Sequence, residues 1–247
     1  MSSRHRSPIL PDADPDDIAF RREGIHRLDT GVRVGEEWLL DHRLPTHTAC
    51  WLPTVLALVE RVPRATLPES VWVSVNADSG LLAHIQLEPA WEILSRRCWE
   101  TGRPLVIEWT EKGCSGEMAE KATNLLSRLQ HRYGLAVAID DMGSPGMDGF
   151  WRLSRVEPQW VKIDGPWFRR AVSGDARQRE GIAIAIELVR RLGAETIVEW
   201  IETPEDRLLA QSLGARFGQG FLWSKERKDH VFAEPKRTGM FAAAVAR

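Results

Sequence analysis

The chain has 247 residues, of which 43% are hydrophobic and 28% are charged, and its formal net charge is −2. This size and composition allow one full-sized hydrophobic core and fit an α/β barrel, which typically needs about 250 residues. With 33 Lys and Arg against 35 Asp and Glu, the chain has no general electrostatic reason to bind DNA or an anionic membrane surface.

The cysteines and the N-terminus indicate the cellular compartment. Cys50, Cys98 and Cys114 are odd in number and lack CxxC spacing, which is typical of reduced thiols. No segment approaches the roughly 20 apolar residues of a membrane span, and the polar, acidic N-terminus does not resemble a signal peptide. We therefore expect a cytoplasmic protein that does not bind membranes.

The first predicted elements are an arm and a hairpin. Residues 1–18 are rich in Pro, Ser and Asp and have little to bury, so they predict a flexible N-terminal arm. Two β-like runs within residues 25–40 flank the turn signal Asp-Thr-Gly at 29–31 and predict a hairpin. Because side chains alternate across a strand, only one of Glu36 and Glu37 can face inward.

Helical and β-like patterns then alternate along the chain. Apolar spacing predicts helices over residues 48–62, 81–101 with an interruption near Pro89, 116–133, 178–192 and from Thr203 onward. Short β-rich runs predict strands over residues 71–76, 105–111, 135–139, 160–163, 196–202 and 217–223. This alternation predicts an α/β barrel over residues 19–228, followed by a polar tail over residues 229–247.

Oxygen-bearing side chains stand at the ends of successive predicted strands. They are Glu37, Asn76, Glu108, Asp140, Asp141 and Glu199. In a barrel these strand ends meet at one mouth, where so many carboxylates need protons or cations to neutralise them. Hard divalent ions prefer oxygen ligands, and two ions about 3.5–4 Å apart can activate water for phosphoryl displacement. Lys162 would offset charge on the attacked phosphate or hold the water.

Each of these residues also has a simpler interpretation. An acid after a strand is often only a helix N-cap, and Lys162 alone is typical of a solvated side chain. Only their joint occurrence at successive strand ends favours a metal centre. Trp38, Trp109 and Trp200 alternate with the candidate ligands, so they are predicted to point into the layer between barrel and helices.

Seven motifs follow one another between residues 25 and 225. They are Glu37-Trp38-Leu39, Ser74-Val75-Asn76, Glu108-Trp109-Thr110-Glu111, Asp140-Asp141-Met142-Gly143, Lys162-Ile163-Asp164, Glu199-Trp200-Ile201-Glu202-Thr203 and Gln219-Gly220-Phe221-Leu222-Trp223-Ser224-Lys225. In order and approximate spacing they resemble the motifs of the EAL domain family of cyclic di-GMP phosphodiesterases. The resemblance implies a modified (β/α)8 TIM-like barrel and hydrolysis of cyclic di-GMP to linear pGpG with two Mg²⁺ or Mn²⁺ ions.

The resemblance also implies a role for each matched residue. The first metal ion would be held by Glu37, Asn76, Glu108 and Asp140, and the second by Asp140, Asp141 and Glu199. Lys162 and Glu199 would position and deprotonate the attacking water. Residues that would support the bound ions, the water and the neighbouring loop are Glu111, Asp164, Glu202 and Gln219.

Three departures from the family pattern fall where substrate recognition is expected. Asp41 replaces an Arg, Glu23-Gly24-Ile25 replaces Gln-Pro-Ile, and the loop over residues 142–146 differs from Phe-Gly-Thr-Gly. They leave two alternatives open, namely a non-hydrolytic regulator that binds cyclic di-GMP or a protein partner, and a phosphodiesterase for another dinucleotide. A homodimer through residues 142–155 is a further expectation from the resemblance.

Overall fold

The computed structural model describes residues 18–40, 51–110, 116–145 and 149–225. Residues 1–17 and 226–247, which contain nearly all of the predicted arm and tail, lie outside this part of the chain. Ile18, the last residue of the predicted arm, is buried, and its carbonyl accepts a hydrogen bond from Arg61. None of the helices in the described ranges is both long and apolar enough to cross a membrane.

Eight strands form one closed barrel in chain order, which confirms the predicted α/β barrel. The strands are β1 (Phe20–Arg27), β2 (Arg33–Leu40), β3 (Trp72–Ala77), β4 (Leu105–Trp109), β5 (Ala136–Met142), β6 (Trp160–Ile163), β7 (Glu195–Val198) and β8 (Phe217–Gln219). Strand β1 runs antiparallel to both β2 and β8, whereas every other neighbouring pair is parallel. The hairpin at residues 29–31, where Gly31 has φ +74°, reverses β1 and so modifies the all-parallel barrel.

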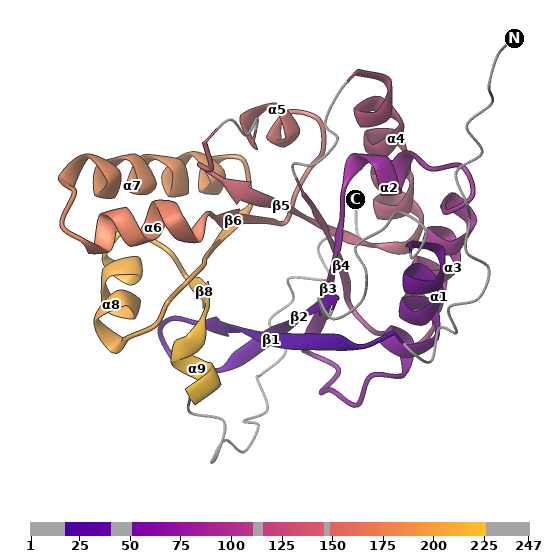
Figure 1. Cartoon of the computed structure of the whole chain (residues 1–247), viewed down its shortest axis with the longest axis horizontal. Coiled ribbons are helices and arrows are strands. Elements are labelled where there is room, and N and C mark those ends of the chain that lie inside the picture. The colour runs from indigo at the N-terminus through magenta and orange to yellow at the C-terminus, as the bar shows by residue number, and fades with distance from the viewer. Residues whose placement is uncertain (1–17, 41–50, 111–115, 146–148, 226–247) are drawn as a thin grey trace, which may run out of the picture.

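Helices cover the outside of the barrel. They are α1 (Trp51–Arg61), a 3-10 helix (Val62–Arg64), α2 (Ser79–Ala83), α3 (Glu88–Glu100), α4 (Gly116–Tyr133), α5 (Gly149–Leu153), α6 (Gly165–Val172), α7 (Ala176–Arg191), α8 (Pro204–Ser212) and α9 (Phe221–Lys225). Figure 1 shows α1 to α4 grouped beside the first half of the sheet and α6, α7 and α8 beside the second half.

Several predictions of local structure are wrong or incomplete, and the strand predicted over residues 196–202 ends at Val198. The predicted strand over residues 217–223 ends at Gln219, and helix α9 begins at Phe221. Gly220 lies between the two elements, where a side chain does not fit, because a Cβ atom there would lie 2.3 Å from the carbonyl oxygen of Ile201. Helix α6 was not predicted. It is short, and it begins where the Asp164 carboxylate accepts a hydrogen bond from the Trp167 N–H at 3.1 Å.

The interior of the barrel is apolar at the N-terminal ends of the strands. Trp72 stacks on Trp160 with ring centroids 4.5 Å apart, and Phe217 meets Trp160 edge-on at 4.9 Å. Gly35 makes room for these rings, because a Cβ atom there would lie 2.3 Å from the Trp72 indole. These rings fill one end of the barrel and leave the other end for polar side chains.

Candidate metal centre

Residues two apart on a strand share a face, so the inward side chains can be followed along each strand. On β6 the inward residues are Trp160 and then Lys162, and on β8 they are Phe217 and then Gln219. The same change from apolar to polar occurs from Val106 to Glu108, from Ala138 to Asp140 and from Ile197 to Glu199. The acidic strand ends therefore converge at the C-terminal mouth, as predicted.

Lys162 lies at the centre of this cluster. Its Nζ atom is 2.7 Å from Glu199 Oε1, 2.8 Å from Glu108 Oε2, 3.2 Å from Glu37 Oε2 and 3.3 Å from Asp140 Oδ1. The Lys162 side chain is only 2% exposed, so its interpretation as a solvated lysine is wrong. One ammonium group thus contacts four carboxylates, three from strands β2, β4 and β5 and the fourth directly after β7.

Glu37 is the member of the Glu36–Glu37 pair that faces inward. Its two carboxylate oxygens accept hydrogen bonds from Asn76 Nδ2 at 2.5 Å and from Gln219 Nε2 at 2.6 Å. Glu36 points to the opposite face, where it accepts a hydrogen bond from Trp38 Nε1 at 2.9 Å. The predicted alternation is therefore confirmed.

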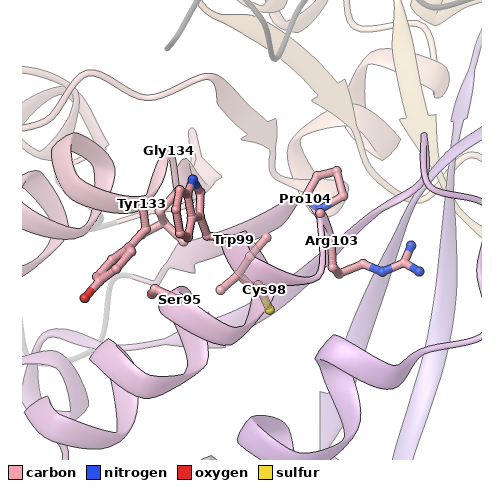
Figure 2. Close-up of a pocket in the computed structure, with 10 residues that line it drawn as sticks. Ser95, Cys98, Trp99, Arg103, Pro104, Tyr133 and Gly134 are labelled. Carbon is pink, nitrogen blue, oxygen red and sulfur yellow. The ribbon is translucent and has the colours of Figure 1, made fainter.

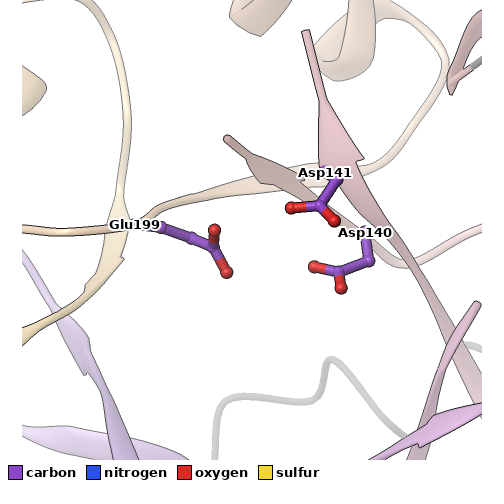
Figure 3. A group of neighbouring side chains, drawn as sticks. All are labelled: Asp140, Asp141 and Glu199. Carbon is purple, nitrogen blue, oxygen red and sulfur yellow. The ribbon is translucent and has the colours of Figure 1, made fainter. Parts of the chain in front are cut away.

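A second group of carboxylates lies beside the lysine. Asp140, Asp141 and Glu199 each offer an oxygen, and these oxygens lie within 4.8 Å of one another. Figure 3 shows the three carboxylates turned toward one another from the ends of β5 and β7. Asp141 has φ +56°, and this left-handed backbone breaks the alternation that would otherwise turn its side chain away from Asp140.

This arrangement fits a hard divalent cation. All the donors are oxygens, which Mg²⁺, Mn²⁺ and Ca²⁺ prefer. Asp140 Oδ1 is buried and accepts no hydrogen bond from the described residues, although it lies 3.3 Å from Lys162 Nζ. A buried carboxylate oxygen left in this state is available to a metal ion. Asp140, Asp141 and Glu199 are the residues that would hold it.

The cluster shifts the acidity of its members in different directions. Burial alone would raise the pKa of Glu37, but the Lys162 charge and hydrogen bonds from Gln219 and Asn76 lower it below its usual value. Burial and repulsion from Glu37 raise the pKa of Glu108 well above its usual value. Burial also raises the pKa of Glu199 to about 7, although Lys162 opposes this shift. Burial would lower the pKa of Lys162, but the surrounding carboxylates raise it well above its usual value.

The raised pKa of Glu199 predicts a pH-dependent stability in protein treated with EDTA. The folded chain keeps a proton on Glu199 that the unfolded chain loses near its ordinary pKa of 4.5. Glu199 therefore destabilises the fold increasingly as the pH rises from about 4.5 to 7. We expect Glu199→Gln to raise the Tm at pH 8 relative to wild type by more than it does at pH 5, as measured by calorimetry.

Glu187→Gln provides the control for this experiment. The pKa of the Glu187 carboxylate is lowered by hydrogen bonds from Arg191 and Arg190, so its loss cannot raise the Tm at pH 8. A Tm difference for Glu199→Gln that is the same at both pH values would contradict the predicted titration.

The remaining predicted site residues take different positions. Gln219 lies in the cluster, whereas Asp164 is buried and caps α6. Glu202 is half-buried, and its N–H donates to Asp206 at the start of α8. Glu111 and Asp41 lie outside the described residues.

The tryptophans that alternate with the candidate ligands divide into two groups. Trp38 and Trp109 are buried on the outer face of the barrel, as predicted, and Trp109 Nε1 donates to Ser79 Oγ at 2.9 Å. The prediction for Trp200 is wrong, because its side chain is 50% exposed. Its backbone has φ +55°, so the strand alternation no longer applies to it.

Two residues near the cluster make contacts that the sequence did not reveal. Glu23 on β1 accepts a hydrogen bond from Gln219 Nε2 at 3.1 Å, so that one amide group bridges Glu23 and Glu37. Arg152 on α5 is fully buried, and its guanidinium donates to the carbonyl oxygens of Trp109 and Asp140. An arginine in a short amphipathic segment gives no sequence signal for such a contact.

A separate cavity of about 160 Å³ lies away from the acidic mouth. Residues that line it include Cys98, Trp99, Arg103 and Tyr133, which Figure 2 labels, and Leu135; they lie near the starts of β4 and β5. Because these are the N-terminal ends of the strands, the cavity belongs to the opposite end of the barrel. Burial raises the pKa of the Cys98 thiol to about 12, which makes it a poor nucleophile.

Comparison with known proteins agrees with this architecture. A model of the EAL domain matches residues 36–226. Cyclic di-GMP phosphodiesterase TpdA of Vibrio parahaemolyticus is 24% identical over 87% of this chain and 35% of its own length. The chain spans between 11% and 42% of the length of the curated relatives that it matches.

Solved structures share the fold. Klebsiella pneumoniae BlrP1, in a complex with manganese and cyclic di-GMP, is similar with a TM-score of 0.68 and 21% identity, over 87% of this chain and 56% of BlrP1. The EAL domain of Mycobacterium smegmatis DcpA is similar with a TM-score of 0.67 and 20% identity, over 85% of this chain and 91% of the DcpA chain.

Proposed function

The chain belongs to the EAL domain family, and from this membership we propose that it is a metal-dependent phosphodiesterase that hydrolyses cyclic di-GMP to linear pGpG. The observation that carries the proposal is the convergence of carboxylates around Lys162 and beside Asp141. Relatives named as cyclic di-GMP phosphodiesterases support the choice of substrate.

We assign two divalent cations, Mg²⁺ or Mn²⁺, to this site. The ligands of the first ion would be Glu37, Asn76, Glu108 and Asp140, and those of the second would be Asp140, Asp141 and Glu199. Bound ions would supply an activated water and neutralise charge on the phosphodiester. The acidic cluster supports this assignment, because its carboxylates need positive charge to remain ionised together.

The chain's own residues would then handle charge and protons. Lys162 presents a fixed ammonium group that stabilises negative charge developing on the phosphate. Glu199, with a pKa of about 7 before any ion binds, is suited to accept a proton from the attacking water near neutral pH. Asn76 and Gln219 hold the Glu37 carboxylate in one orientation. In this proposal Glu202 and Asp164 support the water shell and the start of α6.

The proposal is tested by measuring pGpG release from cyclic di-GMP with MnCl₂. We expect turnover by wild type and a rate of pGpG release more than about a hundredfold lower in Glu37→Gln. Even changes to residues that only hydrogen-bond to metal ligands lower activity about 10–100-fold. Glu36→Gln is the matched control, because Glu36 is equally buried but faces away from the cluster. A folded, Mn²⁺-loaded wild type that releases no pGpG would overturn the proposal.

One observation favours a second candidate function. Glu23 places a carboxylate 3.1 Å from Gln219 Nε2, at the β1 edge of the mouth, where the family pattern has a neutral Gln. Glu23 also pairs with Arg21 at 3.0 Å, and this change of side chain at a position of substrate recognition favours an altered response to the ligand. A non-hydrolytic regulator would bind cyclic di-GMP in a calorimetric titration without releasing pGpG. A phosphodiesterase for another dinucleotide would instead hydrolyse another member of a substrate panel.

The proposed homodimer depends on the region over residues 142–155. Phe150 on α5 is 61% exposed and Trp151 is partly exposed, whereas Leu153 is buried. Residues 146–148 lie outside the described part of the chain. The exposed pair supports the proposal that two copies associate through α5.

A further inference from the structure

Trp200, which directly follows Glu199, is held in an unfavourable backbone conformation. Its φ of +55° lies in the left-handed region, which bulky side chains rarely adopt. Among the described residues other than glycine, only Asp141 shares a positive φ, and it belongs to the acidic cluster. Strained residues persist where the surrounding structure requires them, and they concentrate at functional sites.

The indole of Trp200 lies flat against the backbone of Gly165. A Cβ atom built on Gly165 would lie 2.3, 2.4 and 2.5 Å from Cγ, Cδ2 and Cδ1 of the indole. These nearly equal distances place Gly165 over the face of the ring and not at its edge. Gly165 begins α6 directly after Asp164, so the contact lies at the same end of the barrel as the acidic cluster. The backbone of Gly165 thus supports one face of the ring.

Much of the Trp200 side chain is exposed to solvent. It is 50% exposed, although tryptophan is mostly buried in folded proteins and gains stability from burial. A ring that is supported on one face and exposed elsewhere is preorganised, because binding a flat ligand costs it little conformational entropy. Its chain neighbour Glu199 points into the cluster and contacts Lys162. The indole therefore lies at the same end of the barrel as the acidic cluster and belongs to the residue that follows one of its members.

We propose that Trp200 is the stacking platform for one purine base of the substrate. This inference rests on the proposed function and adds a residue that recognises the base to those that act on the phosphodiester. Nucleobases stack on aromatic side chains whatever their hydrogen-bonding edge, so the platform contributes affinity for purine dinucleotides in general. The strain at Trp200 and the absence of a side chain at Gly165 together build this surface.

The test is a calorimetric titration of cyclic di-GMP with CaCl₂ present. We expect Trp200→Gly to weaken binding about 5- to 150-fold, the range for loss of one base stacked on an aromatic ring. Glycine suits a positive φ, so this change removes the ring without adding backbone strain. Trp200→Phe keeps an aromatic face and is expected to recover most of the affinity. In steady-state kinetics with MnCl₂, Trp200→Gly should raise KM and retain kcat.

Two controls separate stacking from a structural effect. Titration with CaCl₂ alone should give the same affinity for wild type and Trp200→Gly, since the ring is not a metal ligand. Trp99→Ala removes another exposed tryptophan, 61% exposed, which lines the cavity at the opposite end of the barrel. It should leave the affinity for cyclic di-GMP unchanged.

Equal affinity of Trp200→Gly and wild type for cyclic di-GMP would overturn this inference and leave the proposed function intact. Weaker Ca²⁺ binding by Trp200→Gly would also overturn it, because Trp200 would then act by positioning Glu199. Failure of wild type both to bind cyclic di-GMP and to release pGpG would overturn the inference and the proposed function together.

Discussion

Asp140→Asn is expected to lower kcat/KM for cyclic di-GMP by more than about a hundredfold and to weaken Mn²⁺ binding. Asp140 joins the two parts of the site, as Glu199 also does, because it contacts Lys162 and belongs to the group with Asp141. Asparagine keeps the shape of the side chain but removes its charge and one carboxylate oxygen. The measurements are pGpG release and calorimetric titration with MnCl₂.

Asp175→Asn is the matched control for this change. Asp175 caps α7 by accepting hydrogen bonds from the N–H groups of Arg177 and Gln178, and asparagine caps helices equally well. It should leave Mn²⁺ affinity and turnover unchanged. If Asp140→Asn bound Mn²⁺ as tightly as wild type, Asp140 would not be a ligand, and the proposed assignment of both ions would be wrong.

The barrel could be predicted because its elements have local signals. The turn at residues 29–31 and the apolar strand runs depend on residues close together in the chain. The end of β8 was not predicted, and there Gly220 passes against the backbone of Ile201, which is distant in the sequence. Helix α6 has only eight residues and was hidden between β6 and α7, although Asp164 caps it and Pro166 lies in its first turn.

The candidate site was predictable to the extent that alternation along strands is regular. The inward positions of Glu37, Glu108 and Glu199 follow from the period of two residues. Regularity fails at Asp141 and Trp200, whose positive φ values redirect the side chains. The burial of Lys162 could not be predicted from local sequence patterns either, because its contact with Glu37 joins residues 125 positions apart.

The central position of Lys162 leads to a second prediction of large effect. Lys162→Met removes the cation that four carboxylates share and replaces it with an apolar side chain of similar length. Removing one partner of a buried ion pair costs about 3–5 kcal/mol of unfolding free energy, because the remaining charge is left uncompensated. We expect the free energy of unfolding to fall by this amount in EDTA-treated protein at pH 8, as measured by urea denaturation. In a separate assay with MnCl₂, we expect Lys162→Met to lose pGpG release.

Lys121→Met is the control, because Lys121 is 58% exposed and pairs with Glu117 on the surface of α4, where ion pairs contribute little. The loss of unfolding free energy in Lys162→Met should be smaller at pH 5, because protonation neutralises the carboxylates whose charge the lysine otherwise compensates. Added Mn²⁺ should also stabilise Lys162→Met more than wild type, because a divalent ion supplies the missing positive charge. If Lys162→Met were no less stable than Lys121→Met, the carboxylates would not depend on a central cation, and the electrostatic basis for the metal centre would fail.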